Sequence, residues 1–144
     1  MLESSAENGY LPPGEHPATL DEIEERFATN IRRREIMVGL RLVVDQMLQR
    51  GVQTIWVDGG FVTDKPRPKD VDVVYVPPTG ADTSTWGSIA SNNRQVTKDL
   101  YKVDLWTHPS PQGVGRVPIK DWFQLDRSDV PKGIIALTVE EDTE

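Results

Sequence analysis

The chain has 144 residues, which is enough for one domain with a hydrophobic core of its own. Its 16 Lys and Arg against 23 Asp and Glu give a net charge of −7, and this excess of acid argues against an extended nucleic-acid-binding surface. The absence of cysteine excludes disulfides, thiolate metal sites and a cysteine nucleophile. No apolar run is long enough to span a bilayer and residues 1–5 lack the features of a secretion signal, so we expect no membrane association and a cytoplasmic location.

Turn-forming residues and the lack of any periodicity predict that residues 1–18 form an extended N-terminal arm. Residues 19–139 carry the periodic segments and are predicted to form a single domain. Residues 140–144 are mostly acidic and are predicted to be a charged tail.

Two helices are predicted at the start of the domain. Thr19 followed by Glu22 is a capping box, which indicates a short helix from there to about residue 28. Over residues 31–49 apolar side chains recur every three or four positions, and Gly51 is suited to end a helix, so this segment is predicted to be the longest helix. The arginines at 32–34 are expected to lie on its solvated face.

The rest of the domain alternates strand-like and helix-like segments. Strands are predicted, from β-branched and aromatic content, at residues 53–58, 70–76, 101–107 and 133–139. A loose helix is expected within 83–100, a loop at 108–118 and a short helix at 119–126. The fold class is therefore α/β (α+β), with two N-terminal helices packed on a small mixed β-sheet.

Two aspartates open the second predicted strand. Asp70 and Asp72 are two residues apart, so on a strand they lie on one face, and Asp104 occupies the middle of the next strand. Neighbouring carboxylates are costly unless cations neutralise them, so the three aspartates predict a site for two Mg²⁺ or Mn²⁺ ions. In the alternative, Asp70 caps the strand and Asp104 is exposed at an edge. Asp72 then pairs with Lys69 or Lys102.

A pair of glycines ends the first predicted strand. Gly59 and Gly60 can adopt positive φ angles and expose backbone N–H groups to a phosphate, although a plain tight turn is the commoner use of such a pair. The linker that follows carries Lys65, Arg67 and Lys69, which lie where a triphosphate would bind or else form a solvated loop.

The order of these motifs resembles that of the nucleotidyltransferase superfamily, which includes DNA polymerase beta and the minimal nucleotidyltransferases. The matching elements are Gly59-Gly60, the linker 61–69, Asp70-Val71-Asp72, and Asp104 between two apolar residues. The resemblance implies a nucleotidyltransferase-like fold in which Asp70, Asp72 and Asp104 are the catalytic and metal-binding residues.

A closer resemblance covers most of the chain. Its strings are Leu11 to Leu20, Asn30 to Glu35, Asp58 to Lys65, and Pro131 to Ile134. Together they are similar to a small group of bacterial and phage nucleotidyltransferase-like proteins.

These resemblances imply a metal-dependent transferase that moves an NMP, AMP from ATP in the first place, to a hydroxyl group of an acceptor. The nucleotide-binding residues would be Gly59, Gly60, Thr63, Lys65 and Lys69, and the two ions Mg²⁺ or Mn²⁺. Relatives in toxin–antitoxin pairs make protein or tRNA an expected acceptor, besides other RNA or a small molecule.

The chain departs from the family pattern at one position. Gly60 stands where many members carry a serine that holds the triphosphate, and Thr63 is the candidate to replace it. We also expect no separate acceptor-binding domain of the kind that larger relatives carry. The rival hypothesis is therefore a binding module of the same fold, such as an antitoxin-like protein with a protein partner. A third hypothesis is an ordinary metal-free domain.

Overall fold

A computed structural model describes residues 9–110, 116–126, 128 and 130–139 of the chain. The elements that position the site are five strands and four α-helices: β1 Glu15–Ala18, α1 Leu20–Phe27, α2 Ile31–Gln49, β2 Ile55–Asp58, β3 Val71–Tyr75, α3 Arg94–Tyr101, β4 Val103–Thr107, α4 Ile119–Trp122 and β5 Ile134–Leu137. The predicted α+β class and the mixed sheet are confirmed. The predicted tail, 140–144, lies outside the described residues.

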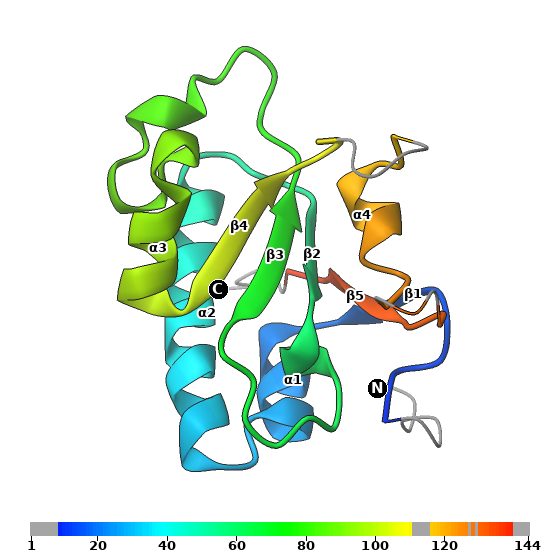
Figure 1. Cartoon of the computed structure of the whole chain (residues 1–144). Helices are drawn as coiled ribbons and strands as arrows, with labels where there is room; N and C mark the ends of the chain where they lie inside the picture. Colours follow the sequence, from blue (N-terminus) through cyan, green and yellow to red (C-terminus); the bar gives the residue numbers. More distant parts are fainter. Residues whose placement is uncertain (1–8, 111–115, 127, 129, 140–144) are drawn as a thin grey trace.

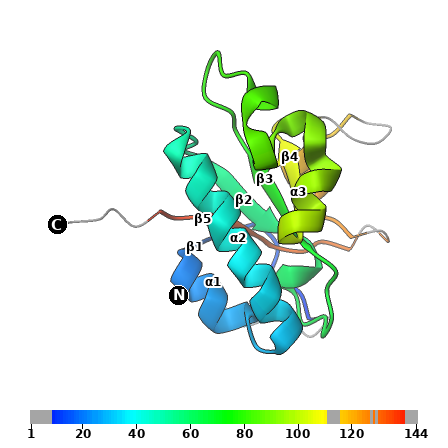
Figure 2. The ribbon, with the colours of Figure 1, turned by 90° about the vertical axis from the view of Figure 1, so that its left-hand side faces the viewer.

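The five strands form one open sheet in the order β1-β5-β2-β3-β4. The outer pairs, β1 with β5 and β3 with β4, are parallel, whereas β5, β2 and β3 alternate in direction. Three helices, α1, α2 and α3, cover one face of this sheet, and α4 lies on the other side (Figures 1 and 2).

Alternation along the strands divides the apolar side chains between two clusters. The larger cluster packs the sheet against α1 and α2 and contains Val57, Val73 and Leu105. The smaller cluster lies on the opposite face and joins Trp56 and Val74 to Ile119 of α4 and Ile134 of β5. This second face is only partly apolar, because on β2, β3 and β4 the next residue of that face toward one end of the strand is an aspartate.

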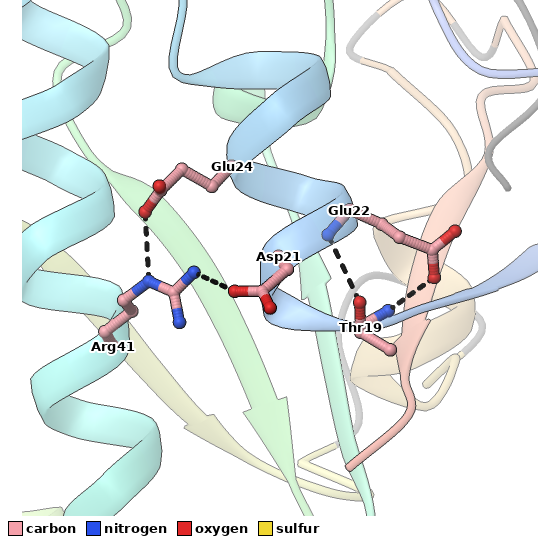
Figure 3. A network of polar contacts seen from close by, with 5 residues as sticks. All are labelled: Thr19, Asp21, Glu22, Glu24 and Arg41. Carbon is pink, nitrogen blue, oxygen red and sulfur yellow. Dashed lines mark hydrogen bonds and ion pairs between the residues drawn. The ribbon is translucent and has the colours of Figure 1, made fainter. Parts of the chain in front are cut away.

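The first helix begins as the sequence predicts. Thr19 accepts a hydrogen bond from the Glu22 amide, and the Glu22 carboxylate accepts one from the Thr19 amide (Figure 3). Arg41 of α2 donates to Asp21 and Glu24 and so joins the two helices at their exposed surfaces. In α2, Asn30 caps the first turn, and Gly51 follows the C-cap with a φ of +86°.

Three predictions need correction. Residues 15–18 are extended as expected but form the edge strand β1 rather than a free arm. The segment 83–100 contains short 3₁₀ turns, and its α-helix starts only at Arg94. The strand predicted at 101–107 begins only at Val103, because Tyr101 ends α3 and Lys102 adopts a left-handed conformation with a φ of +59°.

Candidate functional site: a row of aspartates across the sheet

Three aspartates lie side by side across the three strands β2, β3 and β4. Asp58 is the antiparallel register partner of Asp72, and Asp72 is the parallel register partner of Asp104. Residues directly opposite one another in a sheet project from the same face. The structure therefore brings Asp72 and Asp104 together, as the sequence predicts, and adds Asp58, which the sequence analysis did not select.

Asp70 joins this row from just before β3. It lies two residues from Asp72, and its carboxylate Oδ2 is 3.2 Å from Lys98 Nζ. Lys98 Nζ is also 4.0 Å from Asp104 Oδ2. One ammonium group of α3 thus links two of the three predicted site residues.

Arg94 is the second cation of α3 at the site. Its Nε lies 2.7 Å from Asp104 Oδ1, and its guanidinium carbon is 3.8 Å from the centre of the Trp106 ring. Arg94 and Lys98 are four residues apart, so they project from the same side of α3. Without this helix face, Asp70 and Asp104 would lack their ion pairs.

The Asp72 carboxylate is held from two sides. Trp106 Nε1 donates to Asp72 Oδ1 over 3.3 Å, and Asp72 Oδ2 lies where a Cβ of Gly59 would be. Gly59 has a φ of +86°, and its lack of a side chain leaves the room that this carboxylate occupies. The first glycine of the pair is therefore required by contact with a site residue.

Burial and mutual repulsion raise the pKa values of Asp58, Asp72 and Asp104. Desolvation, followed by the charges of Asp70 and Asp104, raises the pKa of Asp72 to about 7. Desolvation is also the largest cause of a raised pKa at Asp104, against which Arg94 acts. Asp58 has no exposed surface, and its pKa lies well above the ordinary value because of burial and the Asp72 charge.

Arg33 of α2 holds the glycine loop, residues 59–65, through backbone carbonyls. Its guanidinium donates to the backbone carbonyls of Phe27 and Phe61, at 3.1 and 2.7 Å, and to those of Thr63, at 2.7 Å, and Lys65. Only 3% of this arginine is exposed. The expectation that the arginines of α2 form a solvated face is thus wrong for Arg33.

The linker beyond the glycines is tied to the same helix. Arg32 donates to the carbonyls of Pro68 and Lys69, and Asn30 donates to that of Pro66. The start of α2 therefore organises the loop that separates the glycine pair from the aspartates.

The predicted nucleotide-binding residues occupy different positions in this loop. Thr63 is buried, and its hydroxyl donates to the Gly60 carbonyl over 2.7 Å and accepts from the Lys65 amide over 3.1 Å. Lys65 is exposed, and its side chain passes beside Gly60. Lys69 is exposed directly before Asp70.

The sequence analysis missed Asp58, Arg94 and Lys98. Asp58 had a signal, since an aspartate inside a β-branched and aromatic segment is unfavourable without a purpose. The two cations of α3 lie in a segment with a weak helical pattern, and only the parallel pairing of β3 with β4 brings that helix to the aspartates.

Two findings concern the described residues as a whole. No three His, Asp or Glu side chains among them converge closely enough to hold one metal ion in this conformation. Of the helices they form, none combines the length and apolar character needed to cross a bilayer.

Comparison with known proteins gives one result. The model of a family of unknown function, DUF6932, matches residues 4–138. The chain belongs to the DUF6932 family. No curated protein and no solved structure matches it. Because the DUF6932 match spans the sheet from β1 to β5, it includes the whole aspartate row together with the glycine loop and α3.

Proposed function

We propose that this protein is a metal-dependent nucleotidyltransferase that transfers an NMP from an NTP, ATP in the first place, to a hydroxyl acceptor. The acceptor hydroxyl would lose its proton and its oxygen would bond to the α-phosphorus, while the bond from that phosphorus to the oxygen shared with the β-phosphate would break and pyrophosphate would leave. The observation that carries the proposal is the register pairing of Asp72 with Asp104, next to Asp70. This pair lies at the end of the sheet where β2 runs into the Gly59-Gly60 loop. Carboxylates and a glycine loop are thereby adjacent, as the proposed reaction needs. The acceptor would be RNA, a protein or a small molecule.

The residues present fit a divalent cation by their chemistry. Hard cations such as Mg²⁺ and Mn²⁺ prefer carboxylate oxygens, and this site offers Asp70, Asp72 and Asp104. Asp58 is buried beside them without a hydrogen-bond partner for either oxygen, and would add negative charge to the site when deprotonated. A bound cation would have to compete with Lys98 for Asp70 and with Arg94 for Asp104.

When bound at these carboxylates, divalent ions would neutralise phosphate charge and favour deprotonation of the acceptor hydroxyl. A phosphate oxygen could approach the backbone at Gly60 closely only if the Lys65 side chain turned away, because the space beside Gly59 is filled by Asp72 Oδ2. Lys65 and Lys69 contribute positive charge on the solvent side of that loop. The Thr63 hydroxyl would have to leave its two present partners before it contacted a phosphate.

Arg94 and Lys98 have two roles in this proposal. In the structure they neutralise Asp104 and Asp70, which keeps the row stable without a cation. Once a cation took their place, both side chains would be released next to the phosphates. Being half-exposed, they can turn toward solvent without breaking the core.

A transfer assay tests this proposal. Purified protein would be incubated with α-labelled ATP, GTP, CTP or UTP, Mg²⁺ or Mn²⁺, and cell extract, and labelled RNA, protein and small molecules would be separated. We expect label in one acceptor class, and its loss in Asp72→Asn and Asp104→Asn. Asp45→Asn, on the exposed surface of α2, is the matched control and should retain transfer.

A second function is favoured by the same ion pairs. Because α3 already neutralises two carboxylates, the site is also suited to a binding module that has no need of metal. That function predicts no label transfer to any acceptor, and capture of the same partner by the wild type and by Asp72→Asn.

A further inference from the structure

Asp58 is the most unusual buried group among the described residues. Its side chain has no exposed surface, and neither carboxylate oxygen has a hydrogen-bond partner. Burial of a carboxylate without partners is strongly unfavourable, and proteins normally avoid it. In the function proposed above, Asp58 is not one of the metal-binding carboxylates.

Asp58 lies beside Asp72, one of the proposed metal-binding residues. It pairs in register with Asp72, so the two side chains project from the same face of the sheet, with Cβ atoms about 4.5–5.5 Å apart as in any directly opposed pair. Gly59 leaves the space beside them that Asp72 Oδ2 occupies. Asp72 is partly exposed, so it is the member of the pair that faces the approach from solvent.

Charge compensation differs among the four aspartates. Asp70 and Asp104 form ion pairs with α3. Asp58 and Asp72 form no ion pair with any residue that the structure describes. Lys132 acts on both through space and lowers their pKa values, against the larger effect of burial.

We propose that Asp58 and Asp72 together bind one divalent cation, so that Asp58 is a metal ligand outside the set of three carboxylates. When both are deprotonated, as metal coordination requires, the two adjacent carboxylates carry a charge of opposite sign and equal size to that of Mg²⁺ or Mn²⁺, and both offer the oxygen ligands that these ions prefer. Water would fill the remaining coordination positions. This inference shares Asp72 with the proposed function but does not require nucleotide transfer.

Binding of Mn²⁺ alone, without nucleotide, tests the site. The dissociation constant would be measured by electron paramagnetic resonance of free Mn²⁺ for the wild type, Asp58→Asn and Asp72→Asn. We expect each variant to bind at least about tenfold more weakly, as loss of one charged ligand implies. Asp45→Asn removes the same charge from the exposed face of α2 and should bind like the wild type.

A second measurement keeps the test decisive if Asp58→Asn does not fold. In the wild type, addition of Mg²⁺ should shift the side-chain carboxyl ¹³C signal of Asp58 together with that of Asp72. A signal of Asp58 that stays in place while those of Asp70 and Asp104 move would overturn the inference.

The outcomes separate this inference from the proposed function. Equal Mn²⁺ affinity in the wild type and Asp58→Asn refutes Asp58 as a ligand, whatever the transfer assay gives. Weaker binding in Asp58→Asn, without label transfer by the wild type, supports the cation site and refutes the transferase. Absence of Mn²⁺ binding to the wild type refutes the cation site itself.

Discussion

The carboxylate of Asp72 occupies the space that a side chain at Gly59 would need. Because Gly59 also has a φ of +86°, substitution by alanine adds backbone strain to a direct overlap with Asp72 Oδ2. We expect Gly59→Ala to lower the free energy of unfolding by about 2–4 kcal/mol and to weaken any Mn²⁺ binding, both measurable by urea denaturation and titration.

Gly80 provides the matched control for this substitution. Its φ, +78°, is similar, but an added Cβ would meet no atom within 4 Å. Gly80→Ala should therefore cost only the backbone strain of about 1–2 kcal/mol and leave Mn²⁺ binding unchanged. Equal losses of stability in the two variants would mean that the overlap with Asp72 has no energetic consequence.

Arg33 is predicted to be the main support of the glycine loop. Arg33→Met removes donors from four backbone carbonyls, of which three belong to the loop that follows β2, and we expect a loss of about 3–5 kcal/mol in the free energy of unfolding. Thermal and urea denaturation would measure it. Arg34→Met, at the exposed neighbouring position, should change stability by no more than about 0.5 kcal/mol.

The pH dependence of stability should report the raised pKa of Asp72. Between its ordinary value of 3.8 and about 7, the folded protein holds a proton at Asp72 that the unfolded chain releases. This contribution to stability is complete below about pH 4 and is lost as the pH rises to about 7. The side chain of an asparagine at this position does not ionise. At pH 8 and without metal, the free energy of unfolding of Asp72→Asn should therefore exceed that of the wild type by on the order of 2–4 kcal/mol.

Stability curves of both proteins from pH 4 to pH 8 would measure this difference. The gap should close toward pH 4, where both residues are neutral. A gap that stays constant with pH would show that the ionisation of Asp72 does not contribute to it.

Removal of the cations of α3 should affect stability and metal binding in opposite directions. In Arg94→Gln with Lys98→Gln, Asp104 and Asp70 lose their ion pairs, so the metal-free protein should become less stable. A divalent cation then meets no competitor, and Mn²⁺ should bind about two- to fivefold more tightly. Weaker Mn²⁺ binding in the double variant would contradict competition between the cations and the metal.

The control for that pair is Lys102→Gln. Lys102 follows α3 directly but has no ion pair among the residues that the structure describes. Its substitution removes a positive charge, as the substitutions in the double variant do. It should alter neither the melting temperature without metal nor the affinity for Mn²⁺ beyond the small effect of net charge.

Sequence patterns were sufficient where the local signal and the tertiary contact agree. The capping box of Thr19 and Glu22 is satisfied within one turn, and the apolar face of α2 is set by its own periodicity, so both helices were predictable. The same holds for Asp72, because alternation along β3 decides that it shares a face of the sheet with Val74.

Long-range pairing decided what the sequence did not predict. Asp58 acquires its significance only from its register with Asp72, and Arg94 and Lys98 reach the aspartates only through the packing of α3 on β4. Likewise, Arg33 reads as one of several arginines at a helix start. Its burial depends on the carbonyls of a loop far along the chain, which periodicity cannot reveal.

The pairing of β1 with β5 also has a consequence for the order in which the strands can pair during synthesis on the ribosome. Of the five strands, β1 emerges first, yet its only strand partner in the described part of the chain is β5, which emerges last. Strands β2, β3 and β4 can pair as soon as β4 has emerged, with the aspartate row among them. The aspartate row can therefore assemble during synthesis, before β5 is available to pair with β1.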